Sequence, residues 1–218
     1  MPRLRIFYSR DAFGYARRVF GWLCIGGAAA CFAYGLSSWL EQRQYQAEAA
    51  EAFEELRIAE EHPPASATRK SRAPVMVISP FAKLEIERLG VSGYVEDGLD
   101  SATLGRAIGH WPQSAKLGHK GNIVLAAHRD SFFSGLKDVK VGDVVTLRSP
   151  HQKLFQYRVK QFFVVDPSST WVMNPTPEQD MLTLITCFPF RFAGSAPKRF
   201  VVQAEPLIPS ATAFRTSF

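Results

Sequence analysis

At residues 181–190 the chain reads Met-Leu-Thr-Leu-Ile-Thr-Cys-Phe-Pro-Phe. The first six of these residues are apolar or β-branched and favour a buried strand, and Pro189 stops regular continuation just after Cys187. The sequence therefore predicts a strand that ends at a thiol. A buried strand holds such a thiol rigidly, and the outer side of the thiol can still face a groove. This is a suitable position for a nucleophile.

Two further polar side chains occupy similar positions. The apolar run at 123–127 ends at His128, and Arg199 begins the apolar run at 200–204. If the runs that contain Cys187 and Arg199 pair as neighbouring strands, a guanidinium lies within reach of the thiol. Cysteine, histidine and arginine at strand ends form a set suited to thiol chemistry on an acyl group. The alternative is a structural role, because a single cysteine in an apolar strand is more often a small core residue.

Three segments resemble the functional motifs of sortases, the transpeptidases of bacterial surfaces. Residues 183–190 are similar to the catalytic-cysteine motif, and residues 127–136 are similar to the catalytic-histidine segment, particularly that of the class D group. Residues 196–199 match the segment that carries the essential arginine. The resemblance covers roughly residues 80 to 206, with the three functional positions in family order.

Two details refine this resemblance. Gly142 and Asp143 open a predicted strand, as in the family. Ala127 stands where the family carries glycine, so an extra methyl group crowds the histidine loop slightly but removes no catalytic group.

The resemblance implies a role for each residue of the set. Cys187 is expected to attack the threonine carbonyl of an LPxT-type sorting signal and form a thioester. His128 is expected to protonate the leaving amine and later deprotonate the incoming one. Arg199 is expected to hold the substrate and stabilise the oxyanion. The implied partners are surface proteins with a C-terminal sorting signal and an amine acceptor on the cell envelope or on another protein.

Charge and composition narrow the function classes. The chain has 218 residues, 46% of them hydrophobic. Its formal charge of +6 divides into +2 for residues 1–74 and +4 for residues 75–218, without a long basic run in the folded part. Nucleic-acid binding needs a concentrated basic face, so no nucleic-acid partner is expected. The histidines outside the set show no metal-ligand spacing, and no acidic cluster suggests calcium, so neither a metal nor another cofactor is expected.

The N-terminal region has the pattern of a membrane anchor. Five arginines precede an uncharged segment at 19–40, which is long enough as a helix to cross a bilayer. The arginines before it place the N-terminus in the cytoplasm and the rest of the chain outside. A cleaved signal peptide is the alternative, but the apolar run continues past the usual length of such a peptide.

Two segments connect this anchor to the folded part. Residues 41–61 hold seven glutamates and neither glycine nor proline, which predicts an acidic, mostly solvated helical stalk with a thin apolar face of Ala52, Phe53, Leu56 and Ile58. A partner-binding helix is the alternative. The residues that follow are rich in proline, serine and basic residues and are typical of a linker.

Short alternating strands separated by turn residues follow from residue 80 onward, and no long helical period appears. This pattern predicts an all-β fold, a barrel or a sandwich. The sortase resemblance narrows it to a closed barrel of about eight strands with short helices in the connections. The expected segments are a cytoplasmic basic N-terminus (1–18), a transmembrane anchor (19–40), a helical stalk (41–61), a linker (62–79), the catalytic β-barrel (80–208) and a C-terminal tail (209–218).

Some alternatives stay open. A membrane-tethered barrel that binds sorting signals without turnover, or a peptidase that hydrolyses them, would use the same residues. Asp130 either orients its neighbours or is a surface turn residue. Phe188, Phe190 and Phe192 either contact the substrate or pack in the core and rim.

Overall fold

The structure is a computed structural model that describes residues 10–61, 81–192 and 194–207. The chain divides into two compact units, one ending at Glu41 and the other beginning at Gln42. The start of the predicted basic N-terminus (1–9), the predicted linker (62–79) and the predicted tail (209–218) lie outside the described residues.

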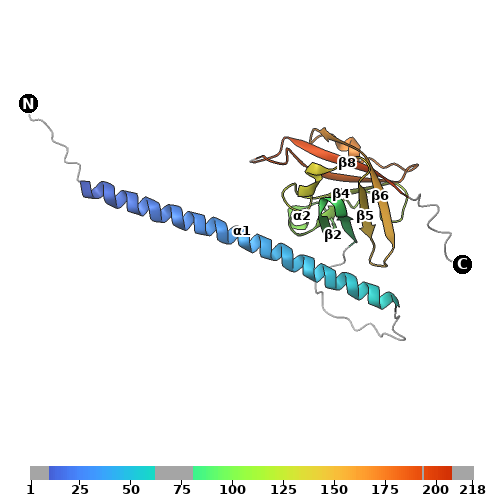
Figure 1. Cartoon of the computed structure of the whole chain (residues 1–218), viewed down its shortest axis with the longest axis horizontal. Helices are drawn as coiled ribbons and strands as arrows, with labels where there is room; N and C mark the ends of the chain where they lie inside the picture. Colours follow the sequence, from blue (N-terminus) through green and yellow to red (C-terminus); the bar gives the residue numbers. More distant parts are fainter. Residues whose placement is uncertain (1–9, 62–80, 193, 208–218) are drawn as a thin grey trace, which may run out of the picture. The chain divides into compact units, whose positions relative to one another are not determined.

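Eight strands form a closed barrel in the order β1-β2-β3-β4-β7-β8-β6-β5. The strands are β1 (Ala82–Ile86), β2 (Val91–Asp97), β3 (Ile108–His110), β4 (Asn122–Ala126), β5 (Val144–Arg148), β6 (Leu154–Val165), β7 (Met181–Phe188) and β8 (Lys198–Pro206). Neighbouring strands are antiparallel except for two parallel pairs, β2 with β3 and β4 with β7. The predicted closed barrel of about eight strands is confirmed (Figure 1).

Short helices lie in the connections, as expected. They are η1 (Glu87–Leu89), α2 (Ser101–Arg106), η2 (Ser134–Asp138) and η3 (Thr170–Met173). Asp100 caps α2, because its side chain accepts hydrogen bonds from the backbone N–H groups of Ala102 and Thr103.

The barrel interior is filled by alternate residues of the strands, as the two-residue period of a strand requires. Leu84, Leu125, Leu147 and Leu184 are fully buried there, and Phe133 joins them from the connection after β4. This single apolar core holds the strands in register, and it leaves the other face of each strand available for a site.

An ion pair between the exposed Arg88 and the buried carboxylate of Asp143 fixes the connection that follows β4. Asp143, just before β5, accepts from the Arg88 guanidinium of η1 at 2.6 Å and from the backbone N–H of Lys140 at 2.8 Å. Arg88 also donates to the carbonyl oxygen of Asp138 at 2.7 Å. The hydrogen bond from Arg88 holds the pKa of Asp143 below its ordinary value of 3.8.

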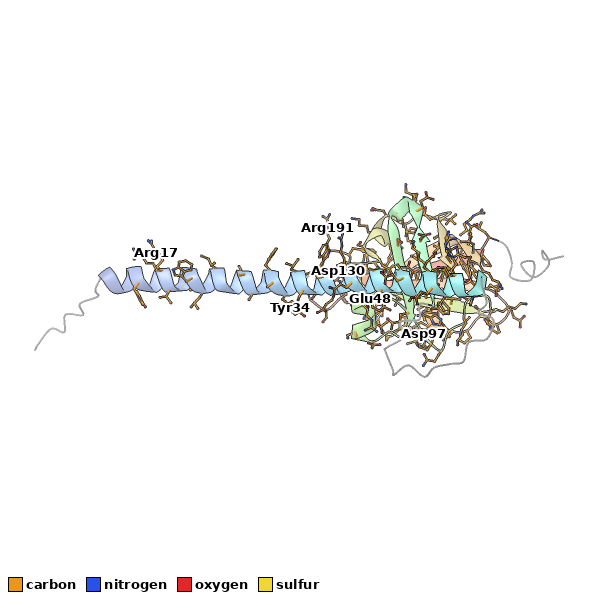
Figure 2. All side chains as sticks on the ribbon, turned by 90° about the horizontal axis from the view of Figure 1, so that it is seen from below. Arg17, Tyr34, Glu48, Asp97, Asp130 and Arg191 are labelled. Atoms are coloured by element: carbon orange, nitrogen blue, oxygen red, sulfur yellow. The ribbon has the colours of Figure 1, made fainter. Side chains whose placement is uncertain are left out.

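A single helix, α1 (Arg10–Glu61), precedes the barrel. In the first unit the described large apolar side chains of α1 are exposed. Tyr34 is one of them, and Figure 2 shows it projecting from the helix. Of the described helices, α1 alone is long and apolar enough to cross a membrane by length and composition. The predicted segment at 19–40 is thus a candidate membrane span.

The later turns of α1, in the second unit, pack on the barrel. Tyr45, Ala49 and Phe53 are buried and lie on one face because they are four residues apart. Ala49 and Tyr45 cluster with Ala107, and the rings of Phe53 and Tyr94 lie 5.6 Å apart. The predicted helix is confirmed, and residues 41–58 other than these three are exposed or partly exposed. The packed face differs from the predicted one, because Leu56 and Ile58 are exposed whereas Tyr45 and Ala49 are buried.

Polar contacts complete this packing. The Tyr45 hydroxyl donates to Glu96 at 2.7 Å, and the Arg106 guanidinium donates to the same carboxylate at 2.9 Å while lying 5.0 Å from the Tyr45 ring. The Gln46 amide donates to the Arg106 carbonyl oxygen at 2.7 Å and accepts from the Tyr94 N–H at 3.1 Å. Burial, followed by the hydrogen bond with Glu96, raises the pKa of Tyr45.

Phe53→Ala is expected to lower the free energy of unfolding of the barrel by about 2–4 kcal/mol, because it removes a buried ring and leaves a cavity. Leu56→Ala on the exposed side of the same helix is the control and is expected to change the stability by less than about 0.5 kcal/mol. The measurement is chemical unfolding of the full chain in detergent, followed by near-UV circular dichroism. Equal stabilities for the two variants would show that the helix contributes nothing to the barrel.

Asp143→Asn is expected to lower the free energy of unfolding at pH 7 by about 1–2 kcal/mol. This is below the usual value of about 1.5–3 kcal/mol for a hydrogen bond to a charged group, because solvent screens the partly exposed Arg88. A pKa lowered on folding stabilises the protein above the ordinary value of 3.8, and that contribution is lost as pH falls through the folded-state pKa. The difference from wild type should therefore shrink below about pH 4. Urea unfolding across pH 3–8 checks this, with the exposed Glu178→Gln as control. A difference that stays constant with pH would contradict the ionic role.

Candidate active site

The strand register brings Cys187 and Arg199 together. β7 and β8 are antiparallel, and Cys187 is the direct cross-strand partner of Arg199. Side chains opposite each other in an antiparallel pair share a face and have Cβ atoms about 5 Å apart. The pairing of the two strands that the sequence analysis considered is thus present, and it places Cys187 and Arg199 on one face.

The parallel neighbour β4 brings His128 to the same edge of the barrel. Ala126 pairs with Ile185, and the backbone N–H of Ala127 donates to the Ile185 carbonyl oxygen at 3.3 Å. The Thr186 hydroxyl donates to the Ala127 carbonyl oxygen at 2.8 Å, so Ala127 and Thr186 lie side by side one residue beyond the pair of Ala126 and Ile185. His128 follows at the level of Cys187, since each lies two residues beyond the pair of Ala126 and Ile185.

The three side chains lie on the outer face of the barrel. Leu182 and Leu184 of β7 point into the core, so Cys187, an odd-numbered residue of the same strand, faces outward. Cys187 and Arg199 are half-buried and His128 is exposed. This combination gives a thiol that is fixed by its strand and still open to a ligand.

Apolar residues form the next row of the same face. Ala126, Ile185, Val201 and Phe163 are consecutive cross-strand partners on β4, β7, β8 and β6. Val201 is fully buried, whereas the other three are partly exposed. The Trp171 ring of η3 stacks on Phe163 at 5.6 Å and is itself 55% exposed, so an aromatic surface adjoins this row.

A buried amide holds η3 over this face. The Asn122 side chain donates to the carbonyl oxygens of Val172 at 3.1 Å and Asn174 at 3.2 Å. The Thr183 hydroxyl donates to the side-chain carbonyl oxygen of Asn122 at 2.7 Å. Sequence reasoning assigned no role to either residue, although Asn122 begins β4 and Thr183 lies in the cysteine motif, because their partners are distant in the chain.

The sequence analysis also assigned no role to Arg129. Its guanidinium donates to the carbonyl oxygens of Pro189 at 3.0 Å, Phe192 at 2.7 Å and Gly194 at 3.3 Å. All three acceptors belong to the connection between β7 and β8. The residue after His128 thereby binds the loop that separates Cys187 from Arg199, and only its position next to the histidine could have drawn attention to it.

The open question of the aromatic residues is settled by their contacts. Phe188 and Phe190 pack against each other and against Phe200, with ring centroids 5.3–6.2 Å apart, and both adjoin the core. They are packing residues. Phe192 is 47% exposed and lies below the Arg129 guanidinium at 5.9 Å.

Two further expectations concern the histidine loop. The Ala127 methyl group is buried in the core cluster, so it is accommodated by the packing there. Asp130 is exposed, and within the described part of the chain its side chain forms no hydrogen bond or ion pair with His128 or Arg129. Asp130 is a surface turn residue.

A second group of polar side chains imitates a catalytic triad. His110 is fully buried, with Nδ1 2.6 Å from Asp97 and Nε2 3.0 Å from the Ser114 hydroxyl. Nε2 also lies 3.1 Å from the carbonyl oxygen of Ala115, and the Ser114 hydroxyl oxygen accepts from the backbone N–H of Val124 at 3.1 Å. The Ser114 hydroxyl itself donates to the Trp111 carbonyl oxygen at 2.7 Å. The group is a structural network.

The described residues contain no group of three or more histidine, cysteine, aspartate or glutamate side chains placed to hold a metal ion. Phosphate-binding or dinucleotide-binding motifs are likewise not part of the site.

Comparison with known proteins supports the same interpretation. The family model of the sortase domain matches residues 84–207, which is more than half of the chain. Sortase D of Bacillus subtilis (strain 168) is 30% identical over 122 residues, which are 56% of this chain and 61% of that protein. The chain thus spans less than two thirds of the length of this relative.

Solved structures agree on the fold. The sortase D5 transpeptidase of Clostridium perfringens superposes with a TM-score of 0.59 at 24% identity, over 77% of this chain and 99% of that one. Sortase C-1 of Actinomyces oris superposes with a TM-score of 0.55 at 26% identity, over 72% and 99%. The chain belongs to the sortase family and is most like its class D members.

Proposed function

We propose that this chain is a membrane-anchored cysteine transpeptidase that cleaves an LPxT-type sorting signal and transfers the surface protein to an amine. The observation that supports this proposal best is the cross-strand pairing of Cys187 with Arg199, with His128 at the matching end of the parallel strand β4. A thiol, a guanidinium and an imidazole, the groups that acyl transfer by a thiol needs, thus come together from β7, from β8 and from the end of β4.

The reaction proceeds in two acyl transfers. The Cys187 thiolate attacks the threonine carbonyl carbon, and the resulting oxyanion is stabilised by the Arg199 guanidinium. The carbon–nitrogen bond then breaks, and His128 gives its proton to the leaving amine, which leaves a thioester. An incoming amine loses a proton to His128 and attacks the thioester, so the new amide forms and the thiolate is released.

The apolar row beside Cys187 suits the aliphatic part of the signal. Ala126, Ile185 and Phe163 are partly exposed beside the thiol, and the Trp171 ring adjoins them. A leucine side chain N-terminal to the cleaved bond would bury apolar surface against this row.

The candidate membrane span suits an enzyme that acts on surface proteins. Five arginines precede residues 19–40, which favours a cytoplasmic N-terminus and an extracytoplasmic barrel. In this orientation the barrel meets exported proteins as they leave the membrane, and the amine acceptor lies on the envelope or on another exported subunit.

The full chain in detergent, incubated with LPxT-type peptides, is expected to gain the mass of the acyl fragment on Cys187. Intact-protein mass spectrometry detects the adduct, and peptide mapping distinguishes Cys187 from Cys24 and Cys31. Added amines are expected to remove the adduct with formation of the amide product. A product with water alone would identify a hydrolytic peptidase, and no adduct from folded protein would favour a module that only binds the signal.

Cys187→Ala is expected to abolish the adduct, because no thiolate remains. Arg199→Ala is expected to lower kcat/KM by about 10²–10³-fold, the usual effect of losing one oxyanion donor. The matched control is Arg158→Ala, an exposed arginine of β6 outside the site, which should keep wild-type kinetics. Full activity of Cys187→Ala would refute the proposal.

Trp171→Ala is expected to raise KM for the peptide about fivefold to tenfold while kcat changes less than about twofold, because an apolar contact contributes equally to substrate and transition state. Leu154→Ala at the far end of β6, also an exposed apolar residue, is the control. Steady-state kinetics with a fluorescent peptide gives both constants. An unchanged KM would exclude Trp171 from the binding surface.

A further inference from the structure

The loop between β7 and β8 is held from one side by Arg129. Three carbonyl oxygens of the loop, those of Pro189, Phe192 and Gly194, accept hydrogen bonds from its guanidinium at 2.7–3.3 Å. The guanidinium also lies 5.9 Å from the centre of the Phe192 ring. A planar guanidinium presents its N–H groups as a fixed fork, so it can bind several carbonyl groups at once where an ammonium cannot.

The same loop is held from the other side by Arg199. Its guanidinium donates to the carbonyl oxygens of Ala196 at 3.2 Å and Lys198 at 3.0 Å. Both acceptors come later in the chain than Gly194, the last residue that Arg129 binds. The orientation of Arg199 therefore depends on the path of the loop, and the path of the loop depends on Arg129.

Within the described part of the chain, the hydrogen bonds of the Arg129 side chain all go to this one loop, and its guanidinium forms no ion pair. Its backbone position is set by β4, through the Ala127 contacts with Ile185 and Thr186. Arg129 thus connects the strand end that carries the histidine to the loop that ends at the arginine.

We propose that Arg129 is a positioning residue that fixes the loop 189–198 and, through it, the guanidinium of Arg199 opposite Cys187. The inference rests on the proposed transpeptidase function for its effect on rate. Its structural part, the ordering of the loop by Arg129, can be measured without any substrate.

The first test is kinetic. Arg129→Met in the full chain is expected to lower kcat about 10–100-fold, because a misplacement of about 1 Å in a catalytic group has an effect of this size. KM should change less than about twofold. Arg129→Lys should give little rescue, since it keeps the charge but not the fork. Arg158→Met is the matched control and should keep wild-type kcat.

The second test is limited proteolysis with trypsin, read by mass spectrometry. Arg191 is an exposed tryptic site inside the loop, and its side chain projects from the barrel (Figure 2). Arg129→Met is expected to increase the rate of cleavage after Arg191 at least about tenfold. Cleavage after Lys160 in β6 reports global unfolding and should stay unchanged.

The third test combines two variants. If Arg129 acts through Arg199, then Arg129→Met should lower kcat less than about threefold in an Arg199→Lys background. Losses that multiply in the double variant would instead mean that Arg129 acts independently of Arg199.

The outcomes separate the two proposals. Wild-type protein that forms no acyl-enzyme would refute the transpeptidase function, while the trypsin test would still decide whether Arg129 orders the loop. Wild-type protein that is active, with an Arg129→Met variant equal to it in kcat and in cleavage after Arg191, would overturn the inference about Arg129.

Discussion

The structure depends on the position of β7 between a parallel and an antiparallel neighbour. Because β4 runs parallel to β7, the carboxyl ends of both strands reach the same edge of the barrel. Because β8 runs antiparallel to β7, its amino end starts at that edge too. Backbone hydrogen bonds therefore bring His128, Cys187 and Arg199 together although 71 residues separate the first from the last. The strand ladder determines the placement, and the side chains add the chemistry.

Much of this arrangement could be predicted from the sequence, for a physical reason in each case. The strands that carry the site are apolar runs, so their period and ends were visible, and β7 begins at Met181, where the pattern indicated. The closed barrel was expected only from the family resemblance, and the order of its strands was not predicted, because pairing between distant segments leaves no local trace. The roles of Arg129 and Asn122 were not visible, because their partners are backbone carbonyl groups, which every residue type has.

The contacts of the helix that precedes the barrel were also not predicted from the sequence. Its composition is acidic, which favours solvent, yet three residues at four-residue spacing bury one face against β2 and the end of α2. Tyr45 is amphipathic, and its hydroxyl meets Glu96, so its burial was not apparent from hydropathy alone. The helix and the barrel thus share part of their stability, although the composition of the helix suggested independence.

The closure of the barrel has a consequence for the peptide recognition proposed above. Each of the eight strands has a neighbour on both sides along part of its length, so the described barrel contains no edge strand. A peptide therefore has no complete strand edge to extend, the mode that gives many peptide-binding domains a sequence-independent part of their affinity. Recognition falls to side chains on the outer face and to the loops around it. New specificities can then evolve by exchange of loops, with no change to the hydrogen-bond ladder beneath them.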